Sequence, residues 1–237
     1  CEITNLSTQQ KVALDIQPLV AENIQARDRS ARVLAAFASA LGGGFTCNAN
    51  KSEITVGYST LYGDLAGVMA LIADLWKYQV YDLGHYLNKT VYGREVIPQA
   101  IFDIVPSAEL SEHHAVDDGK GDPFHYPYHD YLFRSFMEWW EPTSPEEILQ
   151  WYQQGCLEEK LGCEPELVKK LFPSAKLFIA DLERWWSLFK GLGIAKRIQA
   201  PPIVAVSRRA YGFDYREAQN SVYYSRKYRQ LKEQLTE

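Results

Sequence analysis

Two groups of polar residues have types and spacings suited to binding anions. Asn23 and Arg27 stand four residues apart, so on a helix their side chains share one face and could hold a nucleotide or a phosphate. Farther along the chain, Lys196 and Arg197 precede Pro201-Pro202 at the expected end of a helix. Neither group requires a ligand, because the first also suits a solvated helix start and the second also suits the helix dipole.

Two carboxylates flank a glycine-containing loop. Glu53 closes the run Asn50-Lys51-Ser52-Glu53, and Asp64 closes Tyr62-Gly63-Asp64. The loop follows a possible strand end, which is where α/β proteins place ligands. Two carboxylates there could share a hydrated Mg²⁺, which prefers oxygen ligands and retains several waters. Their spacing alone does not distinguish such a site from ordinary surface acids.

Four of the five histidines lie between His113 and His129, close to Glu112, Asp117 and Asp118. They could hold zinc or another transition metal, but they have no compact His/Cys ligand spacing, and this favours a solvated loop. Residues 107–127 lack an apolar period and contain several glycines, prolines and acids. We therefore expect a long loop, of which residues 112–124 are mobile without ligand.

Hydrophobic periodicity predicts the elements that must position these groups. Val12, Leu14 and Ile16 alternate with polar residues, as in a half-buried strand that ends before Pro18, and Phe45–Asn48 could be a short buried strand. Helices are expected over residues 21–42, 69–87, 128–140, from 144 onward, 164–171, 175–199 and 215–235. A strand that feeds a helix is typical of α/β proteins. We expect a predominantly helical α/β fold with few strands.

Composition excludes several classes of protein. The 237 residues are 46% hydrophobic and 23% charged, which is enough apolar material for a core. A net charge of -5 does not indicate a protein whose overall charge attracts it to nucleic acid or to a membrane surface. The four cysteines form no C-x-x-C pair, and no apolar run approaches the ~20 residues that span a bilayer. We expect a soluble cytoplasmic protein with free thiols.

Four segments, taken in order, resemble the NAD synthetase family. They are Glu22-Asn23-Ile24-Gln25-Ala26-Arg27-Asp28-Arg29, the run from Asn50-Lys51-Ser52-Glu53 to Tyr62-Gly63-Asp64, Pro106-Ser107-Ala108-Glu109-Leu110, and Lys196-Arg197-Ile198-Gln199-Ala200-Pro201-Pro202. The resemblance extends from about Ala21 to Gly212. The segments Tyr126–Leu132 and Asp181–Trp186 resemble the glutamine-dependent members, in which a glutaminase precedes the synthetase domain.

This resemblance implies a portion of an adenine-nucleotide α-hydrolase-like domain. The Ser-Gly-Gly-x-Asp-Ser pyrophosphate loop of the family and the glutaminase domain are not found in these residues. We therefore expect residues 1–237 to correspond to the carboxyl-terminal part of the synthetase domain. The implied reaction is attack of the carboxylate of nicotinic acid adenine dinucleotide on the α-phosphorus of ATP, which releases pyrophosphate and forms an acyl adenylate. Ammonia then displaces AMP to give the amide, NAD.

The resemblance also assigns roles to residues. Asn23 and Arg27 become contacts to the dinucleotide, while Ser107 and Lys196 become contacts to phosphate in both substrates. Glu53 and Asp64 become contacts to Mg²⁺ and ATP, and Asp64 also contacts the dinucleotide. The histidine-bearing loop becomes a lid over the reactants. The implied partners are ATP, nicotinic acid adenine dinucleotide and ammonia from a glutaminase domain, in a homo-oligomer.

Two other interpretations remain open at this stage. Aromatic helices could make the chain a non-catalytic interaction or dimerisation fragment of such an enzyme. Alternatively, the histidine-rich loop could make it a helical metal-binding protein.

Overall fold

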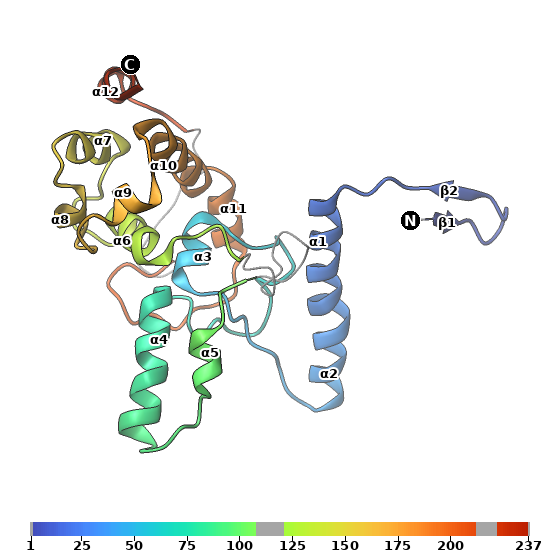
Figure 1. The fold of residues 1–237 in the computed structure, drawn as a ribbon. Coiled ribbons are helices and arrows are strands. Elements are labelled where there is room, and N and C mark those ends of the chain that lie inside the picture. The colour runs from blue at the N-terminus through green and yellow to red at the C-terminus, as the bar shows by residue number, and fades with distance from the viewer. Residues whose placement is uncertain (1, 108–120, 212–221, 237) are drawn as a thin grey trace.

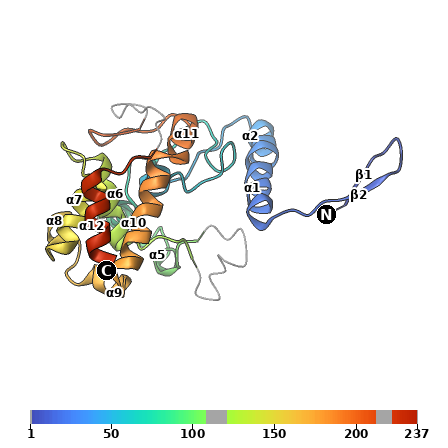
Figure 2. The same ribbon diagram turned by 90° about the horizontal axis from the view of Figure 1, so that it is seen from above.

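A helical body carries one long helix and a small hairpin that stand apart from it (Figures 1 and 2). The computed structural model describes residues 2–107, 121–211 and 222–236. Its elements are β1 (Glu2–Thr4), β2 (Lys11–Ala13), α1 (Pro18–Asp28), η1 (Arg29–Leu34), α2 (Ala35–Ala40), α3 (Lys51–Val56), α4 (Lys77–Tyr86), η2 (Leu87–Val91), α5 (Gln99–Asp103), α6 (Tyr126–Met137), α7 (Pro145–Gln153), α8 (Leu157–Leu161), α9 (Leu167–Leu171), α10 (Ala175–Lys190), α11 (Leu192–Gln199) and α12 (Arg226–Thr236). Within these residues, no helix is long and apolar enough to cross a membrane.

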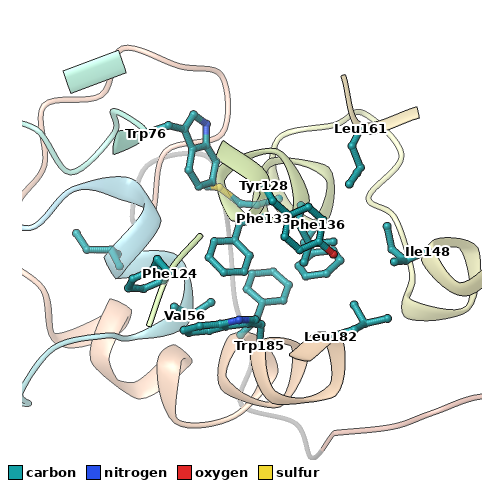
Figure 3. Packing of buried hydrophobic residues seen from close by; sticks show 14 of the residues in the cluster. Val56, Trp76, Phe124, Tyr128, Phe133, Phe136, Ile148, Leu161, Leu182 and Trp185 are labelled. Carbon is teal, nitrogen blue, oxygen red and sulfur yellow. The ribbon is translucent and has the colours of Figure 1, made fainter. Parts of the chain in front are cut away.

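The core forms where α6 and α10 face each other (Figure 3). On α6, Phe133 and Phe136 recur at a spacing of three, and both are buried. On α10, Leu182 and Trp185 repeat that spacing, and the Trp185 ring lies 5.6 Å from the Phe133 ring. Phe124 stacks on Trp185 at 4.8 Å and closes one side. The predicted apolar face of residues 175–199 is therefore confirmed as the centre of the core.

Three short stretches of chain meet side by side at α3. Cys47 forms a parallel bridge with Ala70, and Ala70 forms another with Ile203. Each contact is a single bridge, so the predicted strand at Phe45–Asn48 is reduced to one residue. Val68, Leu71 and Val206 near these bridges are exposed. Parallel pairs are normally covered on both faces, so this arrangement is a minimal parallel ladder with an uncovered side.

The predicted half-buried strand at Lys11–Ile16 is wrong in its burial and its extent. The strand covers Lys11–Ala13 and pairs antiparallel with Glu2–Thr4, and all six residues are exposed. The alternation of apolar and polar residues therefore does not mark a core-facing strand here. The hairpin extends beyond α1 and adds no strand to the body (Figures 1 and 2).

The helix predicted over residues 21–42 exists, while two other predicted helices differ. Helices α1, η1 and α2 run from Pro18 to Ala40, and Gly42 then takes a positive φ of 64°. The helix expected from Met69 begins only at Lys77, because Ala70 bridges to neighbouring chain segments. The helix expected over 175–199 breaks at Gly191, where ψ is -119° and an added Cβ would meet the Ser187 carbonyl at 2.5 Å. Of the last predicted helix, residues 215–221 lie outside the described residues, residues 222–225 are not helical, and α12 begins only at Arg226.

A buried ion-pair cluster holds α3 against the rest of the body. The Lys51 ammonium is fully buried and donates to Asp74 Oδ1 and Glu138 Oε1, both at 2.6 Å. It also donates to Ser207 Oγ at 3.0 Å. Asp74 Oδ2 accepts from the backbone N–H groups of Val206 and Ser207. Although burial favours the neutral acid, the bonds from Lys51 and these amides outweigh it and lower the pKa of Asp74.

We predict that Lys51→Met lowers the free energy of unfolding by about 3–5 kcal/mol, because it leaves the buried Asp74 carboxylate without its cation. Urea denaturation followed by circular dichroism measures the change. The control is Lys89→Met at an exposed position of η2, which should stay within about 0.5 kcal/mol of the parent. A loss no larger than that of the control would contradict the importance of the cluster.

Candidate functional site

Helix α3 ends in a tight loop, residues 57–65, that we call the clamp loop. Gly57 takes a φ of 66°, and a Cβ added there would meet the Gly193 Cα at 2.7 Å. A side chain at either position would separate α3 from α11. The glycine therefore allows the two helices to touch at the point where the clamp loop begins.

Helices α1 and α11, which are distant in the sequence, both form hydrogen bonds to the clamp loop. From α1, Asn23 Oδ1 accepts from Thr60 Oγ1 at 2.8 Å, and Arg27 Nε donates to the Leu61 carbonyl at 3.1 Å. From α11, Lys196 Nζ donates to the carbonyl of Gly57 at 2.7 Å and to that of Ser59. The structure thus brings together residues that lie far apart in the sequence.

Gln199 adds a second pair of contacts from α11. Its Oε1 accepts from Tyr62 N at 3.0 Å, and its Nε2 donates to the Leu65 carbonyl at 3.0 Å. These bonds fix the half of the loop that carries Asp64. Several backbone groups of the clamp loop therefore have defined partners, so its conformation is set before any ligand binds.

The clamp loop carries the acid Asp64, and Lys196 of α11 brings a positive charge to it. Burial raises the pKa of Asp64, although Thr60 N donates to it and Lys196 favours its charged form. Burial lowers the pKa of Lys196, and Asp64 offsets part of that effect. Perturbed pKa values from desolvation beside a charge partner are typical of functional sites.

Glu53 lies at the other end of α3 in a capping box. Its Oε2 accepts from Asn50 N at 3.1 Å, and Asn50 Oδ1 accepts from Glu53 N at 3.1 Å. Burial raises the pKa of Glu53 to about 7, and the nearby Asp122 adds to this while Lys77 opposes it. The charged neighbours of Glu53 thus differ from those of Asp64, although both carboxylates raise the pKa of Cys47 after the larger effect of burial.

The other predicted site residues fall outside these two groups. Ser107 lies at the end of the first described range and has an interaction partner there, and its phosphate role stays a prediction. His113, His114 and most of the predicted lid, residues 108–120, lie outside the described residues. His129 is buried, accepts from His125 N at 2.8 Å and bonds Asp181 at 2.9 Å. Within the described ranges, no group of three His, Cys, Asp or Glu residues could hold a metal ion.

Two residues of the site were missed by sequence reasoning. Lys77 opens α4 and favours the charged forms of Glu53 and Asp130. The helix was predicted to start at Met69, which places Lys77 in its middle. The sequence therefore contains no indication that Lys77 stands at the start of a helix. Ser59, on the clamp loop, has a buried Oγ without a hydrogen-bond partner in the described part of the chain. Only the neighbouring motif points to it.

Comparisons with known proteins identify the family of this chain. Residues 2–160 match the family model described as NAD synthase. The chain belongs to the NAD synthase family. It is 34% identical over 195 residues to a glutamine-dependent NAD(+) synthetase of Thermotoga maritima, and 32% identical over 203 residues to one of Xanthomonas campestris. These alignments cover 82% and 85% of this chain, but only 28% and 31% of the relatives.

A solved structure shares the fold of this NAD synthase family member. The crystal structure of a glutamine-dependent NAD(+) synthetase from Cytophaga hutchinsonii superposes with a TM-score of 0.56 and 18% identity. The match covers 92% of this chain and 30% of that one. At this identity the likeness concerns the fold alone. The chain therefore spans less than a third of the length of these relatives.

The capping box predicts an unusual pH dependence of stability. Glu53 titrates near 4.5 when unfolded and at about 7 when folded, so the native state keeps a proton that the unfolded chain releases. Stability therefore falls as pH rises from 4.5 through about 7. Glu53→Gln keeps an acceptor for Asn50 N and removes the titration. We expect this variant to be more stable than the parent at pH 8, by about 2 kcal/mol.

Thermal unfolding at pH 5 and pH 8 measures this difference. Glu141→Gln, at an exposed position, is the matched control and should behave like the parent. Equal stability of Glu53→Gln and parent at both pH values would show that Glu53 is solvated and charged.

Proposed function

We propose that this chain is the carboxyl-terminal part of a synthetase domain that converts nicotinic acid adenine dinucleotide to NAD. The proposed reaction consumes ATP and passes through an acyl adenylate, and ammonia released from glutamine supplies the amide nitrogen. Membership of the NAD synthase family and the glutamine-dependent relatives support this reaction. Because the chain spans about 30% of those relatives, the proposal concerns the whole protein to which it belongs.

One observation supports the proposal most strongly. The segments that resemble NAD synthetases around Asn23 and Lys196 both hydrogen-bond to the loop between Glu53 and Asp64, across sequence separations of 37 and 139 residues. Segments kept only for local stability have no reason to converge on one loop. A loop held rigid by side chains from two directions suits the positioning of two large substrates.

The reaction joins two polyanions, so their repulsion must be offset. In the proposed arrangement, Asn23 and Arg27 contact the dinucleotide, and Lys196 and Ser107 contact phosphate groups. Arg27 supports this role because it is exposed and only its Nε is used in the bond to Leu61. A guanidinium binds phosphate through paired N–H groups, so those remaining are suited to the task.

Glu53 and Asp64 are the proposed ligands of Mg²⁺. Mg²⁺ typically takes one or two carboxylates and completes its shell with water and substrate phosphates, so two protein oxygens are sufficient. Burial makes the charged form of each carboxylate unfavourable, and a bound cation would relieve this. When bound, the ion would neutralise charge on the phosphates of ATP. The residues themselves fix the positions of the carboxylates through Asn50 and Thr60.

We predict that Asp64→Asn and Glu53→Gln each lower NAD formation by at least about tenfold in the full natural polypeptide, because each removes a charge proposed to face the cation. Coupled detection of pyrophosphate and NAD measures the effect. Asp15→Asn is the matched control, since Asp15 is exposed in the segment between the hairpin and α1. Turnover equal to that of the parent in both variants would contradict the cation role.

An apolar surface favours a second candidate function, a non-catalytic interaction or dimerisation fragment of the same enzyme. On α1 and α2, Leu19, Ile24 and Phe37 are at least half exposed, although helix positions of this kind normally face a core. Exposed apolar residues also lie beside the bridges at Ala70 and Ile203. Such surfaces suit a complementary chain or a second copy.

We predict that the isolated 237-residue chain makes no NAD, even with ATP, Mg²⁺ and ammonia, because no pyrophosphate-binding loop has been found in its sequence. The assay measures the formation of pyrophosphate and of NAD together. Light scattering measures the mass of the chain in solution and so its state of association. Robust turnover by the isolated chain would contradict the assignment of this region and favour a complete site within it.

A further inference from the structure

A cavity lies between α4, α5 and the start of α6, and shares no lining residue with the clamp loop. It has a volume of about 550 Å³, within the usual range for small-molecule sites. Helices α4 and α5 stand next to each other below the core in Figure 1. We call this cavity the aromatic pocket, because five of its lining residues carry aromatic rings: Tyr78, Tyr81, Phe102, Tyr126 and Tyr131.

The rings are held in place by contacts with one another. Tyr78 stacks on Tyr131 with centroids 5.6 Å apart and an interplanar angle of 7°. Tyr81 contacts Phe102 at 6.1 Å, and Phe102 also stacks on His85 at 4.1 Å. All five rings of the pocket are half-buried, so part of each remains open to solvent or a ligand. The walls are therefore preformed aromatic faces.

These faces already accept a cation. The Lys77 ammonium lies 5.6 Å from the centre of the Tyr81 ring and 5.4 Å from that of Tyr126. Lys77 also favours the charged form of Glu53 and of Asp130. The charged side chains of the lining are one cation, Lys77, and two carboxylates, Asp103 and Glu164.

The remaining charged groups of the lining are acidic. Asp103 and Glu164 are exposed, and neither forms an ion pair with another residue in the described ranges. The described partner of Asp103 is the uncharged amide of Gln99, at 2.8 Å. Burial and then the carboxylates of Asp122 and Glu53 raise the pKa of Tyr81, which indicates a negative potential at this wall. Aromatic faces attract organic cations, and acidic side chains in the same cavity add an attraction of the same sign.

We propose that the aromatic pocket binds an organic cation with an apolar body, of the alkylated ammonium class. Its methyl groups would lie against the faces of Tyr81 and Phe102, and Asp103 and Glu164 would supply the opposite charge. An anion is disfavoured by both carboxylates, and a neutral molecule of the same shape would lose the attraction to the rings. The pocket shares Lys77 with the surroundings of Glu53, and no other residue assigned here to NAD formation lines it.

Three probes of matched shape and different charge test the proposal. They are choline, its neutral carbon analogue 3,3-dimethylbutan-1-ol, and the anion 3,3-dimethylbutanoate. Titration of the intact chain is followed by NMR shifts of the residues around the pocket and by calorimetry. We expect saturable binding of choline at least about tenfold tighter than that of the alcohol, and no saturation by the anion. Equal binding of choline and the alcohol, or failure of choline to saturate, would overturn the proposal.

Variants locate the binding on the named residues. Tyr81→Leu keeps an apolar wall without a ring and should weaken choline binding at least about fivefold. Asp103→Asn changes only an exposed group and should weaken it about threefold, with a smaller effect of salt. Asp82→Asn, exposed on α4 and outside the lining, should leave binding unchanged. Unaltered choline binding in Asp103→Asn and in folded Tyr81→Leu would overturn the assignment to this pocket.

Discussion

The ammonium of Lys51 is the interaction on which the rest of the structure depends. A lysine without solvent contact is tolerated only when its charge is matched and its donors are used. Asp74, Glu138 and Ser207 provide this from three separate parts of the chain. Helix α3 has six residues, too few to be stable alone, so its position is set by these bonds and by the core. The clamp loop and the capping box are both built on that position.

The same short helix carries both structure and candidate chemistry. Within Asn50-Lys51-Ser52-Glu53, Lys51 is used for the fold, and Ser52 donates to Asp130 at 2.5 Å while accepting from Lys77 N. Glu53 is different, because its burial disfavours the charge that metal binding requires. Its capping role also uses both carboxylate oxygens, because Oε2 accepts from Asn50 N and Oε1 accepts from Asn50 Nδ2. A glutamine would keep only one of these two acceptors, so the acid serves the capping box as well as the proposed cation site.

The sequence allowed the major helices and the core to be predicted because their apolar period is strong. The helix expected from residue 144 onward, for example, is α7, which Ser144 caps with Glu147 completing the box. The errors have physical causes. In the period from Met69 to Trp76, Ala73 and Trp76 are buried but Met69 is exposed, and the neighbouring Ala70 forms single bridges, so the period resembles a helix without being one. The strand at Lys11 was assigned to the core from its alternation of residues. Such alternation indicates which face of a strand is apolar, but not whether another element covers that face.

The candidate site was harder to predict than the fold. Glu53 and Asp64 could be named from their residue types and the resemblance, but their neighbours depend on contacts made in three dimensions. Lys196 looked like a cation at a helix end, and its use of two carbonyls on the clamp loop is a tertiary contact. Tyr81 and Phe102 come from different helices, so no spacing along the chain indicates the aromatic pocket.

The contacts of α3 also have a consequence for the time order of folding. Thr55 is bonded by Arg197 and by Tyr211 across separations of 142 and 156 residues. Closing such long loops is slow compared with forming α6 or α10, whose bonds are local. A ribosome that adds roughly 5–20 residues per second needs on the order of 10 s to synthesise that intervening chain. During this interval the carboxyl end of α3 lacks these two partners. The clamp loop is therefore among the last parts of the nascent chain to fold.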